Sequence, residues 1–327
     1  MRLTFALLVV LGSGSAWAQQ VISAHAGMIH YVEGDVTIDG TTVHPKFAEF
    51  PDVKNDQVLA TGEGRAEVLL TPGVFLRLAE NSSVRMISNA LTDTRIEVVS
   101  GSVLVEAGEL LPDNAVTFEM RGTRLAIPKR GVYRIDAAAS RVSIFDGQAV
   151  ITAGTGKITA KKGQQVAITD GNLSAQKFDV KSTDAFYRWN ARRAGYIAAA
   201  NLTSARVAAN SDYRSSFGGR SGAWNWNPWF GMYTYMPASG VYWSPFGPAF
   251  YSPGMISTLY IHPRDFAGYG GGRGAAAPPV SAPPSFPVGP PMMSGPRGGG
   301  GMPGGGFSGG GAPAQVGPPP MAGPRGR

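Results

Sequence analysis

The sequence predicts an all-β domain, followed by one helix and a disordered tail that is rich in Gly and Pro. Three observations lead to this fold class. Apolar and polar residues alternate in many short stretches between residues 19 and 176, a glycine-containing unit recurs between such stretches, and the 327 residues include 45 Gly and 25 Pro. Local pattern does not choose among a sandwich, a barrel and a β-solenoid.

The first 18 residues are typical of a secretory signal peptide. Arg2 forms a positive n-region, residues 3–11 form a short apolar stretch, and Ala16-Trp17-Ala18 is a cleavage site of the A-x-A type. The apolar stretch is shorter than the roughly 20 residues that a membrane-spanning helix needs, and no later segment is long enough. We therefore expect a mature chain that starts near Gln19, is soluble, and is periplasmic or secreted.

Composition also limits the kinds of site and of partner that the chain can have. The chain has no Cys, which excludes disulfides, thiolate metal sites and thiol catalysis, so core packing must hold the fold together. Residues 19–176 carry 15 Lys and Arg against 18 Asp and Glu, whereas residues 177–327 carry 13 against 4. The basic second half predicts a peripheral contact with an anionic envelope surface, and export argues against nucleic acid as a partner.

The β domain, residues 19–176, contains one clear hairpin. Residues 65–70 and 74–78 both alternate, and Thr71-Pro72-Gly73 lies between them as a turn. Period two predicts which side chains face the core and which face water. The core set is Ala66, Val68, Leu70, Val74, Leu76 and Leu78, with Val116, Phe118, Met120, Val142 and Ile144 from later strands, and the water-facing set is Arg65, Glu67 and Arg77.

A short unit recurs three times, at residues 31–36, 98–103 and 144–150. Each copy places an apolar strand, a polar residue with Gly, and a second apolar strand. Gly adopts the positive φ of a tight turn without a Cβ penalty. The three copies therefore predict structural turns at Gly34, Gly101 and Gly147, and the hairpin predicts one at Gly73. About 155 residues can bury close to 70% of the unfolded surface, so this domain is expected to fold alone.

These elements together resemble the FecR domain. The resemblance covers residues 25–172 and rests on an ordered set of segments. The segments are Thr61-Gly62-Glu63-Gly64-Arg65-Ala66-Glu67-Val68, the turn at residues 71–73, and residues 76–82, 96–103, 131–136, 142–150 and 162–166. The resemblance implies a multi-hairpin sandwich or a β-solenoid-like domain. Pro72-Gly73 stands where the family usually has Asp-Gly.

The best-known FecR proteins are envelope regulators, whose periplasmic part receives a signal from an outer-membrane transporter and passes it to a sigma factor. This sequence shows neither their cytoplasmic helical region nor their membrane span. It therefore resembles exported proteins that carry the domain alone, and the anti-sigma role is not carried over.

A helix is expected within a helical linker at residues 177–211, spanning about residues 183–209. Ser182 or Thr183 can cap it, and Asp184 lies in the first turn, where the helix dipole favours an anion. Its apolar face is formed by Phe186, Trp189, Ile197 and Ala200, and Arg193 interrupts that face.

Residues 212–264 form an aromatic segment with two similar halves, Asn227-Pro228-Trp229-Phe230-Gly231 and Ser244-Pro245-Phe246-Gly247. Pro and Gly oppose the formation of long strands there. Two interpretations stay open. The rings offer a platform for a sugar or a partner's pocket, or they clamp the segment onto the β domain or the helix, which we favour. The candidate binding residues are Trp224, Trp226, Trp229, Tyr233, Tyr235, Tyr242 and Trp243.

No catalytic motif, metal-ligand set or cofactor motif stands out in the chain. We therefore expect a non-enzymatic cell-envelope protein that binds or scaffolds, with another envelope protein or cell-wall glycan as its partner. The alternatives are a carbohydrate-binding module built on the aromatic segment and a signal-receiving domain for an envelope regulator. The last part, residues 265–327, holds 20 Gly and 14 Pro and predicts the disordered tail.

Overall fold

A computed structural model describes residues 25–44, 46–110, 113–209 and 222–259. The predicted signal peptide and the Gly/Pro-rich tail lie outside these ranges and stay predictions. Among the residues that are described, no helix is both long and apolar enough to cross a membrane.

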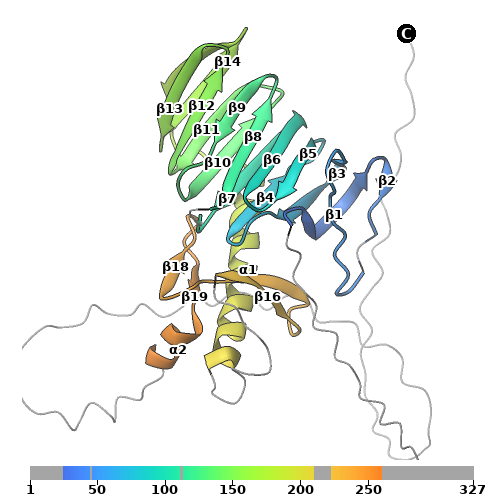
Figure 1. The fold of residues 1–327 in the computed structure, drawn as a ribbon, viewed down its shortest axis with the longest axis vertical. Helices are drawn as coiled ribbons and strands as arrows, with labels where there is room; N and C mark the ends of the chain where they lie inside the picture. Colours follow the sequence, from blue (N-terminus) through green and yellow to red (C-terminus); the bar gives the residue numbers. More distant parts are fainter. Residues whose placement is uncertain (1–24, 45, 111–112, 210–221, 260–327) are drawn as a thin grey trace, which may run out of the picture. The chain divides into compact units, whose positions relative to one another are not determined.

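Fifteen strands form one hydrogen-bonded sheet, which confirms the all-β class (Figure 1). The strands are β1 (Met28–Ile38), β2 (Thr41–Thr42), β3 (Val58–Leu69), β4 (Val74–Leu78), β5 (Ser83–Ala90), β6 (Asp93–Ser100), β7 (Ser102–Ala107), β8 (Ala115–Met120), β9 (Thr123–Ala126), β10 (Gly131–Asp136), β11 (Arg141–Asp146), β12 (Gln148–Ala153), β13 (Gly156–Lys161), β14 (Gln164–Thr169) and β15 (Asn172–Lys177).

The order of the strands divides the sheet into two wings. The first wing is β13-β12-β9-β8-β6-β5, the second is β4-β7-β10-β11-β14-β15, and β3 joins them. The chain passes from one wing to the other repeatedly, so both wings contribute to one core. The end strands β13 and β15 contact each other, and the sheet is therefore nearly closed.

The predicted hairpin is present as β3 and β4, with Glu67 opposite Arg77 and Val68 opposite Leu76. All eleven predicted core residues are buried in the main cluster. The prediction that Glu67 and Arg77 face water is wrong, because both side chains are completely buried. Arg65 is partly exposed, with 21% of its side chain accessible. Strand β4 is buried on both faces, since the outer face of the second wing is covered by later parts of the chain.

The four predicted turn glycines all have positive φ, between 71° and 88°. Gly73 lies in the turn between β3 and β4. Gly101 and Gly147 are corners rather than hairpin turns, because the chain crosses there from one wing to the other, from β6 to β7 and from β11 to β12. Gly34 is not a turn either. It lies within β1, where the pairing with β3 shifts register between Gly34 and Val36.

Replacing Gly34 by Ala is expected to destabilise the domain more than replacing Gly40 by Ala. Both glycines have positive φ, but a Cβ at Gly34 would lie 2.1 Å from the carbonyl oxygen of Glu63, whereas nothing lies within 4 Å of one at Gly40. Overpacking against the backbone adds about 1–3 kcal/mol to the shared backbone penalty. Urea unfolding of the two variants measures the difference, and equal losses of stability would contradict the close approach.

The predicted helix is α1 (Ala185–Ala209), and its apolar face packs on the second wing. Phe186, Trp189, Ile197 and Ala200 are all buried, as expected. The N-cap is Asp184, and not Ser182 or Thr183, because its Oδ1 accepts the N–H of Tyr187 at 2.8 Å. Burial raises the pKa of Asp184, but this N–H and the guanidinium of Arg134 together hold it below its ordinary value.

The aromatic segment folds as two short hairpins and a helix, which we call the cap. The cap consists of β16 (Ala223–Asn227), β17 (Met232–Met236), β18 (Val241–Trp243), β19 (Ala249–Tyr251) and α2 (Pro253–Leu259). Its two similar sequence halves are the two hairpins, one at β16–β17 and one at β18–β19. The cap packs on α1 and on the outer face of the sheet, as the clamp interpretation predicts.

Candidate functional site: a charge cluster beneath the cap and an exposed aromatic tip

The seven candidate binding residues do not form one exposed platform. Trp224, Tyr233, Tyr235 and Tyr242 are buried in the cluster that joins the cap, α1 and the outer face of the sheet, and Trp226 is partly buried. Their rings meet edge to face, for example Trp224 with Phe75 at 5.0 Å between centroids. Only Trp229 and Trp243 of the seven are mainly exposed, at 64% and 59%. Binding through these two rings stays a prediction.

Beneath the cap lies a buried cluster of charged side chains from the outer face of β3, β4 and β7. Arg77 is its centre. Its Nε donates to Glu67 Oε2 at 2.6 Å, and its Nη1 donates to Glu106 Oε2 at 2.8 Å. All three side chains are at most 1% exposed. The three strands are neighbours in the sheet, so the register of the hairpin brings these groups together.

Two further segments bind Glu67 from opposite sides. Arg193 of α1 donates from Nη2 to Glu67 Oε1 at 2.7 Å, and His30 of β1 contacts the same oxygen through Nδ1 at 2.8 Å. The N–H of Tyr233 in the cap donates to His30 Nε2 at 3.0 Å. Because Nε2 accepts this bond, the proton of a neutral His30 must be on Nδ1.

The pKa shifts in the cluster follow from this geometry. Burial lowers the pKa of His30, since a charged imidazole loses its water, although the neighbouring Glu67 opposes the shift. Burial alone would raise the pKa of Glu67, but Arg193, Arg77 and His30 hold it well below its ordinary value. The cluster therefore pairs Glu67 and Glu106 with two guanidinium groups, those of Arg77 and Arg193.

The second cap hairpin closes the other end of the cluster. The hydroxyl of Ser244 donates to Glu106 Oε1, and the N–H of Phe246 donates to Ser244 Oγ at 3.2 Å. Close by, the hydroxyl of Tyr235 donates to Glu109 Oε2. These bonds connect the sheet with residues more than a hundred positions later in the chain. The cluster is thus a polar clamp that fixes the cap in one register on the sheet.

Sequence reasoning missed this cluster, although one signal was present. Arg193 interrupts the apolar face of α1, and a charge in such a position needs a buried partner. The alternation of β3 correctly placed Glu67 on the face opposite the main core. It did not show that later parts of the chain cover this face and exclude water from it.

One exposed part of the cap is the turn between β16 and β17, which Asn227 holds in place. Asn227 Oδ1 accepts the N–H groups of Trp229 and Phe230, both at 3.0 Å. Its Nδ2 donates to the carbonyl oxygen of Ala200 at 2.8 Å and to Ser204 Oγ at 3.1 Å, both on α1. Since Asn227 is fully buried, it anchors the turn to the helix.

A third aromatic ring joins the turn from the loop after β2. Phe47 is 80% exposed, compared with 64% for Trp229 and 40% for Phe230. A Cβ on Gly231 would lie 2.5 Å from the Phe47 ring, so this ring packs directly on the glycine backbone. We call Phe47, Trp229 and Phe230 the aromatic tip.

Behind the aromatic tip, a series of ring contacts leads inward to the charge cluster. Phe47 meets Trp226 edge to face at 6.4 Å, Trp226 meets Phe50 at 5.7 Å, and Phe50 meets His30 at 5.8 Å between centroids. Within the tip, Phe47 is thus supported by packed rings down to the sheet.

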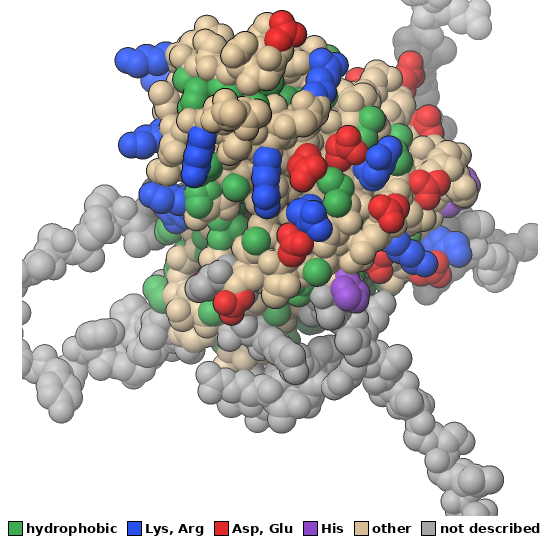
Figure 2. Space-filling view, turned by 45° about the horizontal axis from the view of Figure 1, so that its top comes forward, with side chains coloured by type: hydrophobic (Ala, Val, Ile, Leu, Met, Phe, Trp, Pro, Cys, Tyr) green, Lys and Arg blue, Asp and Glu red, His purple; other side chains and the backbone are tan. Residues whose placement is uncertain are grey.

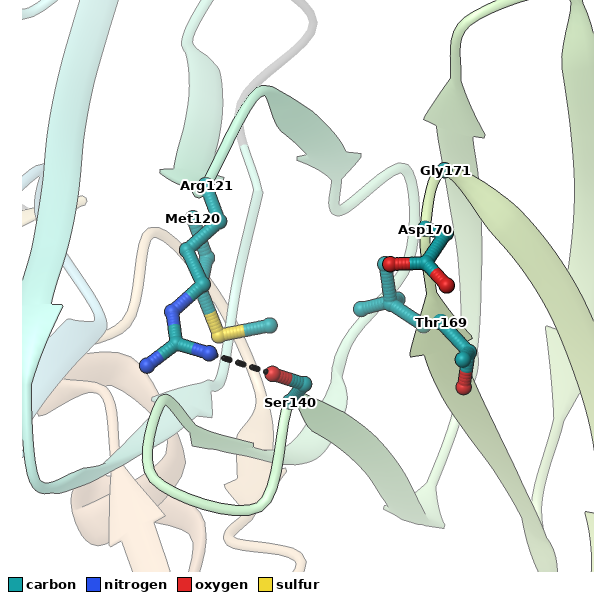
Figure 3. A pocket seen from close by; sticks show the side chains of 7 residues that line it. Met120, Arg121, Ser140, Thr169, Asp170 and Gly171 are labelled. Atoms are coloured by element: carbon teal, nitrogen blue, oxygen red, sulfur yellow. Dashed lines mark hydrogen bonds between the residues drawn. The ribbon is translucent and has the colours of Figure 1, made fainter.

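A hollow of about 390 Å³ lies at the turn ends of β8, β11 and β14, and no candidate binding residue lines it (Figure 3). Arg121 donates to Ser140 Oγ at 2.8 Å on one side, and Asp170 faces the hollow from the other side. Arg121 and Asp170 both have positive φ and precede Gly residues in two-residue turns. Tight hairpin turns therefore account for this shape.

The face of the molecule seen in Figure 2 carries many charged side chains, unlike the aromatic tip. Basic and acidic side chains are interspersed across it, with only small hydrophobic areas between them. Such a mixed surface is what a solvated sheet face needs for solubility.

Comparison with known proteins shows only a distant likeness. No family profile matches the chain, and no curated protein matches it. Two crystal structures of a proposed anti-sigma factor from Parabacteroides distasonis are 13% and 12% identical in sequence, each with a TM-score of 0.34. The matched region covers 38% of this chain and 61% of the other. A likeness at this level carries no argument about function, and the resemblance to the FecR domain stays a prediction.

Proposed function

We propose that this chain is a non-enzymatic binding or scaffolding protein of the cell envelope, and that the aromatic tip is its contact surface. The observation that carries the proposal is the exposure of three large rings, two of them on a backbone anchored by the buried Asn227 and the third packed on Gly231. The signal peptide predicted at residues 1–18 supports the envelope setting.

Exposed aromatic side chains that stand together need an explanation, because leaving apolar surface in water is unfavourable. Here the rings are also held in place. The bonds from Asn227 fix the backbone of Trp229 and Phe230, and Gly231 seats the ring of Phe47. A surface that is ordered before it meets a ligand loses little conformational entropy on binding. The arrangement therefore favours recognition over a purely structural role.

The proposal is tested by the triple variant F47A/W229A/F230A. Purified mature protein is sedimented with washed envelope fragments that contain both membrane and cell wall. We expect the triple variant to be retained at least tenfold less than the wild type, because the three rings supply the contact area. The urea midpoint should change little, since Phe47 and Trp229 are mostly exposed and Phe230 is partly exposed.

Trp243 provides the matched control, because it is equally exposed but lies on β18, outside the aromatic tip. W243A should be retained like the wild type. Retention of the triple variant at the wild-type level, or an equal loss in W243A, would show that the tip is not the contact surface.

A further inference from the structure

The geometry points to a polysaccharide as the ligand of the aromatic tip, with sugar rings stacked on Trp229 and its neighbours. This inference rests on the proposed function and names the class of ligand for it. It goes beyond a general binding role, because the charged and polar groups around the tip fit a glycan better than an anionic lipid surface.

The rings of the tip have the form that sugar recognition needs. A pyranose ring presents C–H groups on its face and hydroxyl groups around its edge. The face of an aromatic ring carries partial negative charge, so it attracts such C–H groups while both apolar surfaces leave water. Trp229, 64% exposed and on a fixed backbone, offers the largest of these faces, and Phe47 and Phe230 offer two more.

Polar groups that can meet hydroxyl groups border the tip. Lys46 and Glu49 stand on either side of Phe47 in the same loop and form an exposed ion pair at 3.2 Å. A lysine ammonium donates hydrogen bonds and a glutamate carboxylate accepts them. Sugar hydroxyl groups do both, so one ring stacked near Phe47 could bond to each member of the pair.

The charge around the tip argues against an anionic membrane. The hairpin from Gly222 to Met236 contains no Asp, Glu, Lys or Arg. In the loop, the two lysines Lys46 and Lys54 stand against three acidic residues, Glu49, Asp52 and Asp56, so basic residues are not in excess. Binding to anionic lipid depends on a cluster of Lys and Arg beside the apolar group. A surround without excess basic charge fits a neutral or weakly charged polysaccharide instead.

The test measures retention of the full mature chain on three insoluble polysaccharides, namely chitin, cellulose and purified peptidoglycan sacculi, and on phosphatidylglycerol vesicles. On the vesicles, the basic second half of the chain can bind by charge, so W229A should be retained there like the wild type. On at least one polysaccharide we expect retention. W229A should lower this retention at least tenfold, W229F should keep most of it, and W243A should keep all of it. On uncharged chitin or cellulose, raising the salt from about 0.05 to about 0.5 M should change the retention less than twofold, because neither polysaccharide carries a charge.

Several results would overturn the inference. The inference is wrong if no polysaccharide retains the chain, or if only the vesicles retain it. It is also wrong if a polysaccharide retains W229A as well as it retains the wild type. The proposed function fails separately. If envelope fragments still retain the wild type but not F47A/W229A/F230A, while no polysaccharide does, then the tip is a contact surface for a protein or lipid and only the glycan is wrong.

Discussion

Replacing Arg77 by Met is expected to lower the free energy of unfolding by about 3–5 kcal/mol, the usual cost of leaving buried charges without a partner. Met fills nearly the same volume, so little of this loss comes from a cavity. Glu106 would lose the guanidinium that it binds, and Glu67 would keep only Arg193 and His30. Urea unfolding followed by circular dichroism measures the effect.

The double variant R77M/E106Q separates charge from shape. The side-chain amide that E106Q introduces can still accept the hydroxyl of Ser244, and Glu67 keeps its ion pair with Arg193, so the buried charges balance again. We expect the double variant to recover at least half of the stability that R77M loses. A loss below about 1 kcal/mol in R77M, or no recovery in the double variant, would contradict a buried, balanced cluster.

Acidification is expected to destabilise the folded chain in two successive ranges of pH. The pKa of His30 is lowered in the folded state, so below its ordinary value of 6.5 the unfolded chain takes up a proton that the folded chain resists. The pKa of Glu67 lies well below 4.5, so the stability that it contributes is present above pH 4.5 and is lost as the pH falls further. Each loss amounts to about 1.4 kcal/mol per pH unit while only the unfolded chain binds the extra proton.

Two carboxyl groups act in the opposite direction. Burial raises the pKa of Asp52 and of Glu109, so the folded chain protonates these groups more readily than the unfolded chain does. Both are less buried than His30 and Glu67, which are completely enclosed, and we expect the cluster to dominate.

The variant H30Q isolates the first range, because Gln can hydrogen-bond but does not titrate. Urea midpoints measured from about pH 8 to about pH 4 at constant ionic strength should decline below about pH 6.5 in the wild type. In H30Q the decline should start only near pH 4.5, the ordinary pKa of a glutamate. A wild-type midpoint that stays constant between about pH 7 and about pH 5 would show that His30 is not held in its neutral form by the bond from Tyr233.

Local patterns in the sequence are enough to predict the individual elements of the fold. The alternation of residues 65–70 and 74–78 identified the hairpin and its core face, since period two in a strand puts apolar side chains on one side. The two Pro/Gly-containing halves of the aromatic segment marked two similar turns, and the structure adds a short hairpin at each of them.

The covering of the outer face of the sheet follows from contacts between distant segments, which are visible in the folded chain and not in local sequence patterns. Glu67 on a strand is satisfied equally well by water or by an arginine, and the pattern of β3 is the same in both cases. Its partner Arg193 lies 126 residues away, and no local pattern reports a pairing over that distance. The same packing divides the aromatic segment into rings that hold the cap, such as Tyr235, and rings that face solvent, such as Trp229. Composition alone treats these rings alike, because burial is a property of the assembled fold.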